Sequence, residues 1–177
     1  MIISKPTDKE FNDFFRVYID LVPTDDLLLA LRESNDDLVK LFKSIPQEIE
    51  VFRYDTNKWS IKEVLMHIID FERYFAFKAF VSLRNDNETI LHHPKREHYL
   101  FNAGTEKRNL GDLIPEFISV RSATISLFEH VSIPQLPHIV SHANASHAIS
   151  ACALGFALVG HCLHHMEIIK ERYVVFS

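Results

Sequence analysis

A long uncharged segment near the C-terminus limits the folds open to this chain. Residues 139–166 contain no Asp, Glu, Lys or Arg, and from about Ser146 apolar residues occupy nearly every side of a helix. A helix that is apolar all round has to be surrounded by other elements. Because the segment also contains Asn, Ser and His, it indicates a buried helix with its approach loop rather than a membrane span. We therefore expect a helical bundle with 146–174 as its central helix.

Two histidines interrupt this apolar helix. His161 and His165 are four residues apart, so a helix projects both imidazoles from one face. Burying imidazoles costs free energy unless their nitrogens find partners, and one shared metal ion would satisfy both. The spacing alone is weak evidence, because 11 His in 177 residues give about 0.7 such pairs by chance. The apolar surroundings are what make this pair a candidate for part of a metal site.

A second pair with the same spacing, His138 and His142, lies in a different setting. It falls between Pro137 and Asn144, in a segment without helical periodicity. A solvated loop is the favoured interpretation there.

The composition favours one helical domain. A length of 177 residues suits a single domain, 1–177, that builds its own core. Only four Gly and as many as 14 Phe favour helices packed through aromatic side chains. The formal net charge of −5, without a run of Lys and Arg, argues against nucleic acid as a partner.

The cysteines and the N-terminus predict a cytoplasmic protein without membrane attachment. Cys152 and Cys162 lie about 15 Å apart along one helix, too far for a disulfide within it, so we expect reduced core thiols. The first residues carry no apolar signal core.

Four long helical patterns stand out, and no convincing alternating strands do. The expected fold is all-α, a four-helix bundle. A short amphipathic piece at 9–22 precedes the long helices, which we expect at 24–44, 60–83, 110–131 and 146–174.

Capping residues place the helix starts. Thr24 is the expected N-cap of the first long helix. The second begins with a capping box, Ser60 with Glu63. Pro115 fits the third only if that helix starts close to it, at about Ile114, because proline is tolerated in the first turn.

The connection between the second and third helices is long enough to change the topology. It spans about 25 residues, 84–109, and could reach about 80 Å when extended, whereas a 24-residue helix is about 36 Å long. The link can therefore run the length of the bundle and leave these two helices parallel.

A metal site needs a further ligand from a facing helix, and His67 is the candidate. It lies two turns into the second helix, between Val64 and Phe71 on a stripe expected to face inward. Three neutral imidazoles at about 2.0–2.1 Å from an ion leave a position open, as in catalytic sites. Zn, Ni, Fe, Mn and Cu all suit three histidines. For His67 taken alone, a core or half-exposed histidine is the alternative.

Two stretches carry a resemblance to a known family. Residues 58–72 (KWSIKEVLMHIIDFE) and 160–165 (GHCLHH) resemble the DinB/YfiT-like metal-binding four-helix bundle superfamily. The resemblance extends from the first long helix onward and includes the third helix with Arg121. It implies an up-down-down-up bundle, frequent homodimers and a divalent metal, often nickel or zinc. The family's histidine triad corresponds to His67, His161 and His165.

The same resemblance indicates the activity only broadly. Characterised relatives include transferases that act with low-molecular-weight thiols such as bacillithiol and a mycothiol-dependent isomerase, and many members have no assigned activity. It implies a metal-dependent thiol S-transferase or hydrolase acting on small electrophilic molecules. The alternatives are a stress-related bundle that binds a metal or ligand without turnover, and a structural bundle with incidental histidines.

Two neighbours of the histidine pair have open roles. His164 matches a histidine of the family's terminal motif but points about 60° away from the line of His161 and His165. It is a candidate for orienting a ligand or carrying a proton, with helix packing as the alternative. Cys162 lies about 100° round the helix from His161, so we interpret it as a packing residue.

Two carboxylates flank His67 at helical spacing. Asp70 and Glu63 are within reach of the second nitrogen of that imidazole, and carboxylates in this position orient ligand histidines. Exposed charges on the helix surface are the slightly favoured interpretation.

The long connection is rich in histidine and basic residues. If it crosses the mouth of the site, its charges could meet an anionic thiol or substrate, whereas a solvated loop is the favoured interpretation. The residues concerned are His92, His93, Lys95, Arg96 and His98.

Overall fold

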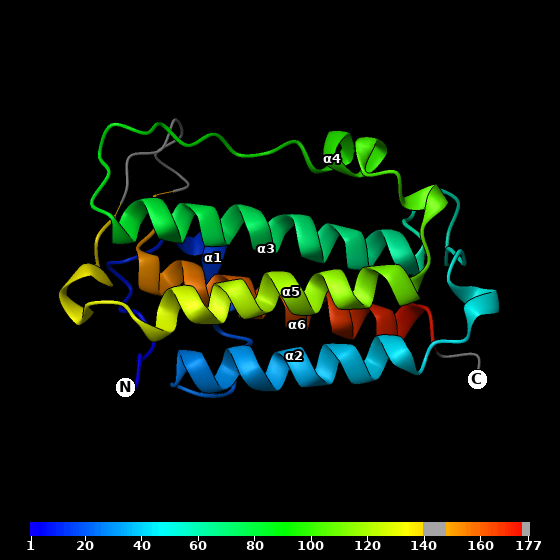
Figure 1. Ribbon diagram of the computed structural model, residues 1–177, viewed down its shortest axis with the longest axis horizontal. Helices are drawn as coiled ribbons and strands as arrows, with labels where there is room; N and C mark the ends of the chain where they lie inside the picture. The colour runs from blue at the N-terminus through cyan, green and yellow to red at the C-terminus, as the bar shows by residue number, and fades with distance from the viewer. Residues whose placement is uncertain (140–147, 175–177) are drawn as a thin grey trace.

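Four long helices form a bundle in the structure, a computed structural model that describes residues 1–139 and 148–174. Figure 1 shows that α2 and α6 run in one direction and α3 and α5 in the other, which is the up-down-down-up order. The described residues contain no strand, only a single bridge between Ile139 and Ser150. The all-α prediction is confirmed. The bundle helices are α2 (Leu27–Lys43), α3 (Ile61–Leu83), α5 (Leu110–Glu129) and α6 (Ala151–Arg172).

Shorter helices occupy the connections. The N-terminal helix α1 (Asp13–Ile19) packs against α6, and α4 (Arg96–Asn102) lies over α3 (Figure 1). The link from α3 to α5 runs the length of the bundle, which leaves these two helices parallel as predicted. The Tyr74 hydroxyl ties this link to α3 by donating to the His92 carbonyl at 2.9 Å. The helical periodicity did not predict α4. Single 3-10 turns lie at Gln47–Ile49, Thr105–Lys107 and Ile133–Gln135.

Two helix starts follow their capping groups. The prediction of Thr24 as the first N-cap is wrong: α2 begins at Leu27 because the Asp26 carboxylate accepts from the N–H groups of Leu28 and Leu29. The capping box of α3 is confirmed, since the Ser60 hydroxyl accepts from the Glu63 N–H and the Glu63 carboxylate accepts from the Ser60 N–H.

Of the other two starts, that of α5 agrees with the predicted range and that of α6 differs from it. A second capping box, Asn109 with Asp112, starts α5 at Leu110, so Pro115 lies inside the helix instead of in its first turn. Proline lacks the N–H that would bond the carbonyl of Gly111, but Gly111 is exposed and water can take that bond. The helix α6 begins at Ala151, later than expected, because Ser150 caps it. Residues 146 and 147 lie outside the described part of the chain.

A buried polar layer divides the core into two apolar clusters. One cluster is built on Leu27–Leu31 of α2, Phe71–Leu83 of α3 and the first half of α6. The other gathers the far halves of α2 and α6 with the starts of α3 and α5. The residues buried between them are polar: Ser34, His67, Glu72, Arg121 and His161. The bundle thus places these five buried polar residues between the two apolar clusters.

The central helix of the bundle is α6, as the uncharged segment predicts. It is long and apolar enough to cross a membrane by length and composition, but 72% of its most apolar stretch is buried inside the bundle, as in the core helix of a water-soluble protein. Both cysteines are free and buried.

Candidate metal centre

Three imidazoles converge between α3 and α6. Nε2 of His161 lies 3.0 Å from Nε2 of His67 and 3.1 Å from Nε2 of His165. The candidate ligand atoms of all three lie within 4.8 Å of one another. His161 and His165, on one face of α6, thus lie next to His67 of α3, the third ligand that the sequence indicates.

The spacing of these nitrogens fits an ion. Two ligand nitrogens at 2.0–2.1 Å from one tetrahedral ion lie about 3.3 Å apart, close to the observed separations. A neutral imidazole carries a proton on one nitrogen and a single lone pair on the other. The Nε2 atom of His161 can therefore make one good hydrogen bond, not two, although it faces two other Nε2 atoms. A shared cation would satisfy all three lone pairs at once.

Burial keeps these imidazoles neutral, the form that binds metals. The pKa of His67 is lowered to about 3, first because burial disfavours the imidazolium and then because of the positive charge of Arg96. The pKa values of His161 and His165 also lie well below the ordinary value, again chiefly through burial and then through the neighbouring histidines. No proton has to be displaced near neutral pH.

Aromatic rings hold the histidines in place. The Trp59 ring lies 4.6 Å from the His67 ring, centroid to centroid, and Phe71 lies 4.5 Å from the same ring and stacks on His161 at 5.5 Å. The two flanking carboxylates are engaged elsewhere. Asp70 pairs with Arg73 at 3.6 Å, while Glu63 caps α3 and pairs with Arg53.

The helix α1 docks directly beside the triad, and a glycine makes this possible. A Cβ at Gly160 would lie 1.9 Å from the carbonyl oxygen of Tyr18. This contact places the Tyr18 ring 5.5 Å from His161 and 5.7 Å from His164. Periodicity does not single out Tyr18. The available signal is Gly160 itself, since glycine inside a buried helix marks a close backbone approach.

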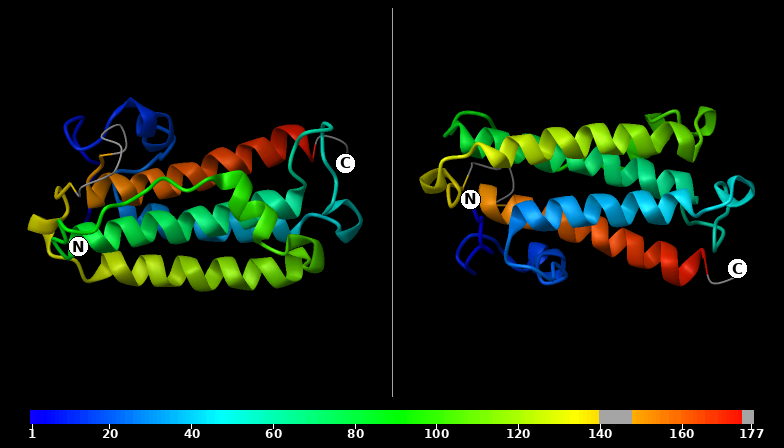
Figure 2. Two further views of the ribbon diagram at one scale, coloured as in Figure 1. Left: turned by 90° about the horizontal axis from the view of Figure 1, so that it is seen from above. Right: turned by 60° about the horizontal axis from the view of Figure 1, so that its bottom comes forward.

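The triad faces a cavity of about 580 Å³. Seen from above in Figure 2, the connection before α4 runs over the line between α3 and α6, and residues 93–98 on it line the cavity, so it does cross the site. His93 and His98 line the cavity from this connection, whereas His92 contributes its carbonyl to the bond with Tyr74. The size is typical of small-molecule sites. The remaining lining residues are Phe14, Tyr18, Phe71, Phe75, Pro94, Lys95, Arg96, Glu97 and His164.

Three other sequence candidates lie apart from the triad nitrogens. His164 is exposed at the rim, with its ring 5.2 Å from that of His165. Cys162 is buried against Met166, and burial raises the pKa of its thiol to about 11, in keeping with a packing role. His138 is half-buried and its partner His142 lies outside the described residues, so the interpretation of that pair stays a prediction.

A second buried polar cluster lies in the same layer, between α2, α3 and α5. Arg121 donates to both carboxylate oxygens of Glu72, at 2.6 and 2.8 Å, and its remaining Nη donates to the Leu31 carbonyl at 2.9 Å and the Ser34 hydroxyl at 2.6 Å. Burial opposes the charge on the guanidinium, but pairing with Glu72 outweighs it and raises the pKa of Arg121. This cluster is fully paired within the chain.

Comparisons with known proteins agree with the geometry. A search of curated proteins found no similar sequence. Among solved structures, YfiT from Bacillus subtilis, described as a probable metal-dependent hydrolase with an unusual four-helix bundle topology, superposes with a TM-score of 0.73. The match covers 94% of this chain and 90% of YfiT at 14% identity, so it shows the fold alone. The sequence profile of the DinB superfamily matches residues 30–169, which include all three histidines. The chain therefore belongs to the DinB superfamily.

Proposed function

We propose that this protein is a metal-dependent enzyme acting on small electrophilic molecules, as a hydrolase or a thiol S-transferase. The observation that carries the proposal is the position of the triad at a small-molecule cavity. Structural zinc sites use four protein ligands, whereas catalytic sites use three and leave a position for water or substrate. The description of YfiT as a probable metal-dependent hydrolase supports the same reaction class.

The chemistry follows from the donor set. A divalent ion held by His67, His161 and His165, for which we favour zinc or nickel, would lower the pKa of water or a thiol and so supply a nucleophile at neutral pH. The aromatic side chains of the cavity lining would hold the apolar part of a substrate. His164 stands at the rim with an exposed imidazole, which suits it to carry a proton between the cavity and solvent.

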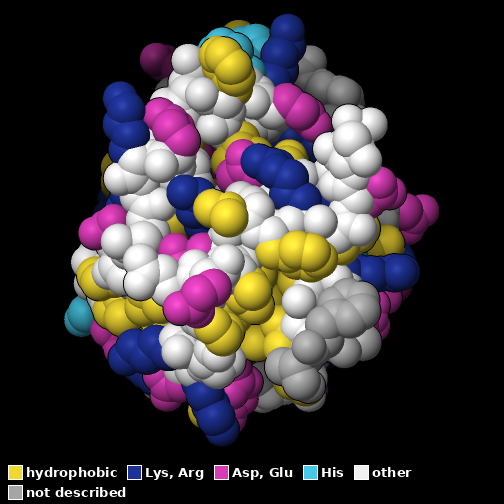
Figure 3. All heavy atoms as spheres, turned by 90° about the vertical axis from the view of Figure 1, so that its right-hand side faces the viewer, with side chains coloured by type: hydrophobic (Ala, Val, Ile, Leu, Met, Phe, Trp, Pro, Cys, Tyr) yellow, Lys and Arg dark blue, Asp and Glu magenta, His cyan; other side chains and the backbone are white. Residues whose placement is uncertain are grey.

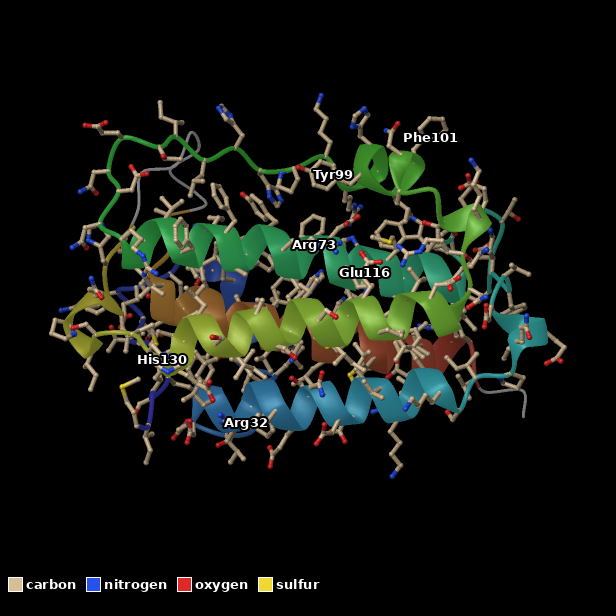
Figure 4. All side chains as sticks on the ribbon, viewed as in Figure 1. Arg32, Arg73, Tyr99, Phe101, Glu116 and His130 are labelled. Carbon is tan, nitrogen blue, oxygen red and sulfur yellow. The ribbon has the colours of Figure 1, made fainter. Side chains whose placement is uncertain are left out.

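Metal content tests the ligands. Protein made without a histidine tag is expected to retain about one zinc or nickel ion per chain by mass spectrometry, and His67→Ala or His161→Ala to lose it. His130→Ala is the matched control, because His130 is exposed at the far end of α5 from α4 (Figure 4). Full metal content in His161→Ala would remove the basis of the proposal.

Product analysis separates the two reactions. Metal-loaded protein is incubated with esters, amides and alkylating electrophiles, with and without a low-molecular-weight thiol, and products are identified by mass. Addition of water indicates the hydrolase and a thiol adduct the transferase. If metal raises the melting temperature but no substrate turns over, the non-catalytic binding alternative is the better one.

The role of His164 has its own test. His164→Gln is expected to lower turnover by about a hundredfold, the lower end for general acid–base catalysis, while metal content stays unchanged. Unchanged turnover would exclude the proton-carrier role. The homodimer and the cytoplasmic location stay predictions.

A further inference from the structure

The cavity carries positive charge on an acidic protein. The chain has a formal net charge of −5, yet the charged residues that line the cavity are Lys95, Arg96 and Glu97, a net excess of one positive charge. In the end-on view of Figure 3, histidine and Lys/Arg side chains lie together at the top of the molecule, over the level of α4 in Figure 1. A concave site with one sign of charge concentrates ligands of the opposite sign.

Arg96 reaches the histidines from above. Its guanidinium carbon lies 5.8 Å from the centroid of the Trp59 ring, and that ring lies 4.6 Å from the ring of His67. Its charge contributes to lowering the pKa values of His67 and His165, after the larger effect of burial. The guanidinium is therefore close enough to contact a molecule bound at the triad.

The present partner of Arg96 is weakly held. Arg96 Nε donates to Glu97 Oε1 at 2.6 Å, but the side chains are 62% and 68% exposed. Exposed ion pairs contribute about 0–1 kcal/mol, so this one is readily exchanged. A ligand carboxylate that accepts from two guanidinium N–H groups makes a stronger contact than this single bond. Lys95 forms no ion pair within the described residues and adds a second cation.

Part of the cavity lining is apolar. Phe71 and Phe75 are buried, and Phe71 stacks on His161 at 5.5 Å. The exposed ring of Phe14 closes this side, and the His93 ring lies 6.0 Å from Phe14 and 6.1 Å from Phe71. A molecule bound in the cavity therefore meets both aromatic side chains and cationic residues.

We propose that this cavity binds small monocarboxylic acids with an apolar, ring-sized body. The body packs against Phe14, Phe71 and Phe75, and the carboxylate accepts hydrogen bonds from Arg96 and Lys95. The inference rests on the proposed function in one respect: it takes the bound acid as the substrate class of the enzyme. Binding of the acid itself is measured without turnover.

Calorimetry with three probes tests the two halves of the ligand. The probes are 3-phenylpropionate, its uncharged amide, and acetate, titrated into zinc-loaded and metal-free protein. The acid is expected to bind about tenfold more tightly than the amide, because a charge-assisted bond at an exposed site gives about 1.4 kcal/mol. Acetate, without the apolar body, is expected to bind more weakly still. Trp59 is the only tryptophan and contacts both Arg96 and His67, so its fluorescence is a second readout.

Charge variants assign the head-group contact. Arg96→Gln is expected to weaken binding of 3-phenylpropionate about tenfold and to leave binding of the amide unchanged. Lys107→Gln is the matched control, because Lys107 is exposed on the same connection but does not line the cavity. Circular dichroism confirms folding of each variant.

Three results would overturn the inference: equal affinity for the acid and the amide, equal losses in Arg96→Gln and Lys107→Gln, or acid binding that needs zinc and ignores Arg96→Gln. The last result would assign the carboxylate to the metal. The outcomes also separate this inference from the proposed function. If the protein takes up no zinc but binds the acid through Arg96, the inference is supported and the proposed enzymatic function is contradicted. If the protein turns over substrates but binds the acid and the amide equally well, the proposed function is supported and the inference is contradicted.

Discussion

The two buried polar clusters of this bundle lie between the same two apolar clusters but are completed differently. Arg121 finds acceptors for its N–H groups on two other helices, Glu72 on α3 and Leu31 and Ser34 on α2. The histidine triad instead turns three nitrogens toward one another and toward a cavity. A buried polar group is costly unless it is paired. The Arg121 cluster, which is paired within the chain, therefore supports the fold. The histidine triad, whose lone pairs lack a partner, can accept a ligand from outside.

The largest effect is expected at the closed cluster. Arg121→Met leaves the buried Glu72 carboxylate without its partner and is expected to lower the free energy of unfolding by about 3–5 kcal/mol in urea titrations. The double variant Arg121→Met/Glu72→Met is expected to recover most of this loss.

The control for Arg121 is a less buried ion pair between the same two helices. Arg73 and Glu116 point toward one another across α3 and α5, 2.6 Å apart (Figure 4). Arg73→Met is expected to cost less than about 1 kcal/mol. Similar losses for Arg73→Met and Arg121→Met would contradict a structural role that depends on burial.

Metal binding is the next largest effect and belongs to the open cluster. Zinc at 100 times its dissociation constant is expected to raise the free energy of unfolding of the wild type by about 2.7 kcal/mol. His161→Ala is expected to show no such gain, and His130→Ala the full gain. If Arg121→Met also abolished zinc binding under conditions where it remains folded, the two clusters would be one unit rather than two.

A smaller effect is expected from adding a side chain at Gly160, where the backbone of α1 contacts α6. Gly160→Ala puts a Cβ against the Tyr18 backbone and is expected to cost about 1–3 kcal/mol and to increase hydrogen exchange in α1. Gly155→Ala on the same helix meets the flexible Leu27 side chain at 2.5 Å and is expected to cost less. A larger loss in Gly155→Ala would show that α1 is not held by this contact.

The smallest effect is the response of the metal-free protein to acid. The folded pKa of His67, about 3, lies below the ordinary value of about 6.5, so the unfolded chain binds more protons as the pH falls. The stability due to neutral His67 is thus present above pH 6.5 and is lost as the pH falls from there toward 3. Between pH 7.5 and 5.5 this amounts to about 1.4 kcal/mol in urea titrations. Over the same pH range, the free energy of unfolding of His67→Gln is expected to fall by about 1.4 kcal/mol less than that of the wild type. If both proteins lost stability with the same pH slope, His67 would not be the group responsible.

Local patterns predict the helices well because a segment contains the information for its own periodicity. The Ser60 capping box, the parallel course of α3 and α5, and the shared face of His161 and His165 all follow from spacing or length. The errors fall at helix ends, where nearby caps compete. Asp26 caps α2 in place of Thr24 because its carboxylate reaches two N–H groups of the first turn.

Contacts between segments are less predictable because they depend on how each helix is rotated and docked. The pairing of Arg121 with Glu72 joins residues 49 positions apart, and the periodicities of α3 and α5 do not encode it. The same holds for Tyr18, which reaches the triad only because α1 lies on Gly160.

The sequence by itself determines a four-helix bundle whose central helix presents two histidines on one face, with His67 as the candidate to join them. Only the tertiary structure brings the three Nε2 atoms together, lays Arg96 over them and keeps Arg121 apart in a closed cluster. The physical reason is that helical spacing fixes the direction of a side chain relative to its own helix. The packing of helices against one another decides which of those directions meet and which remain open to a ligand.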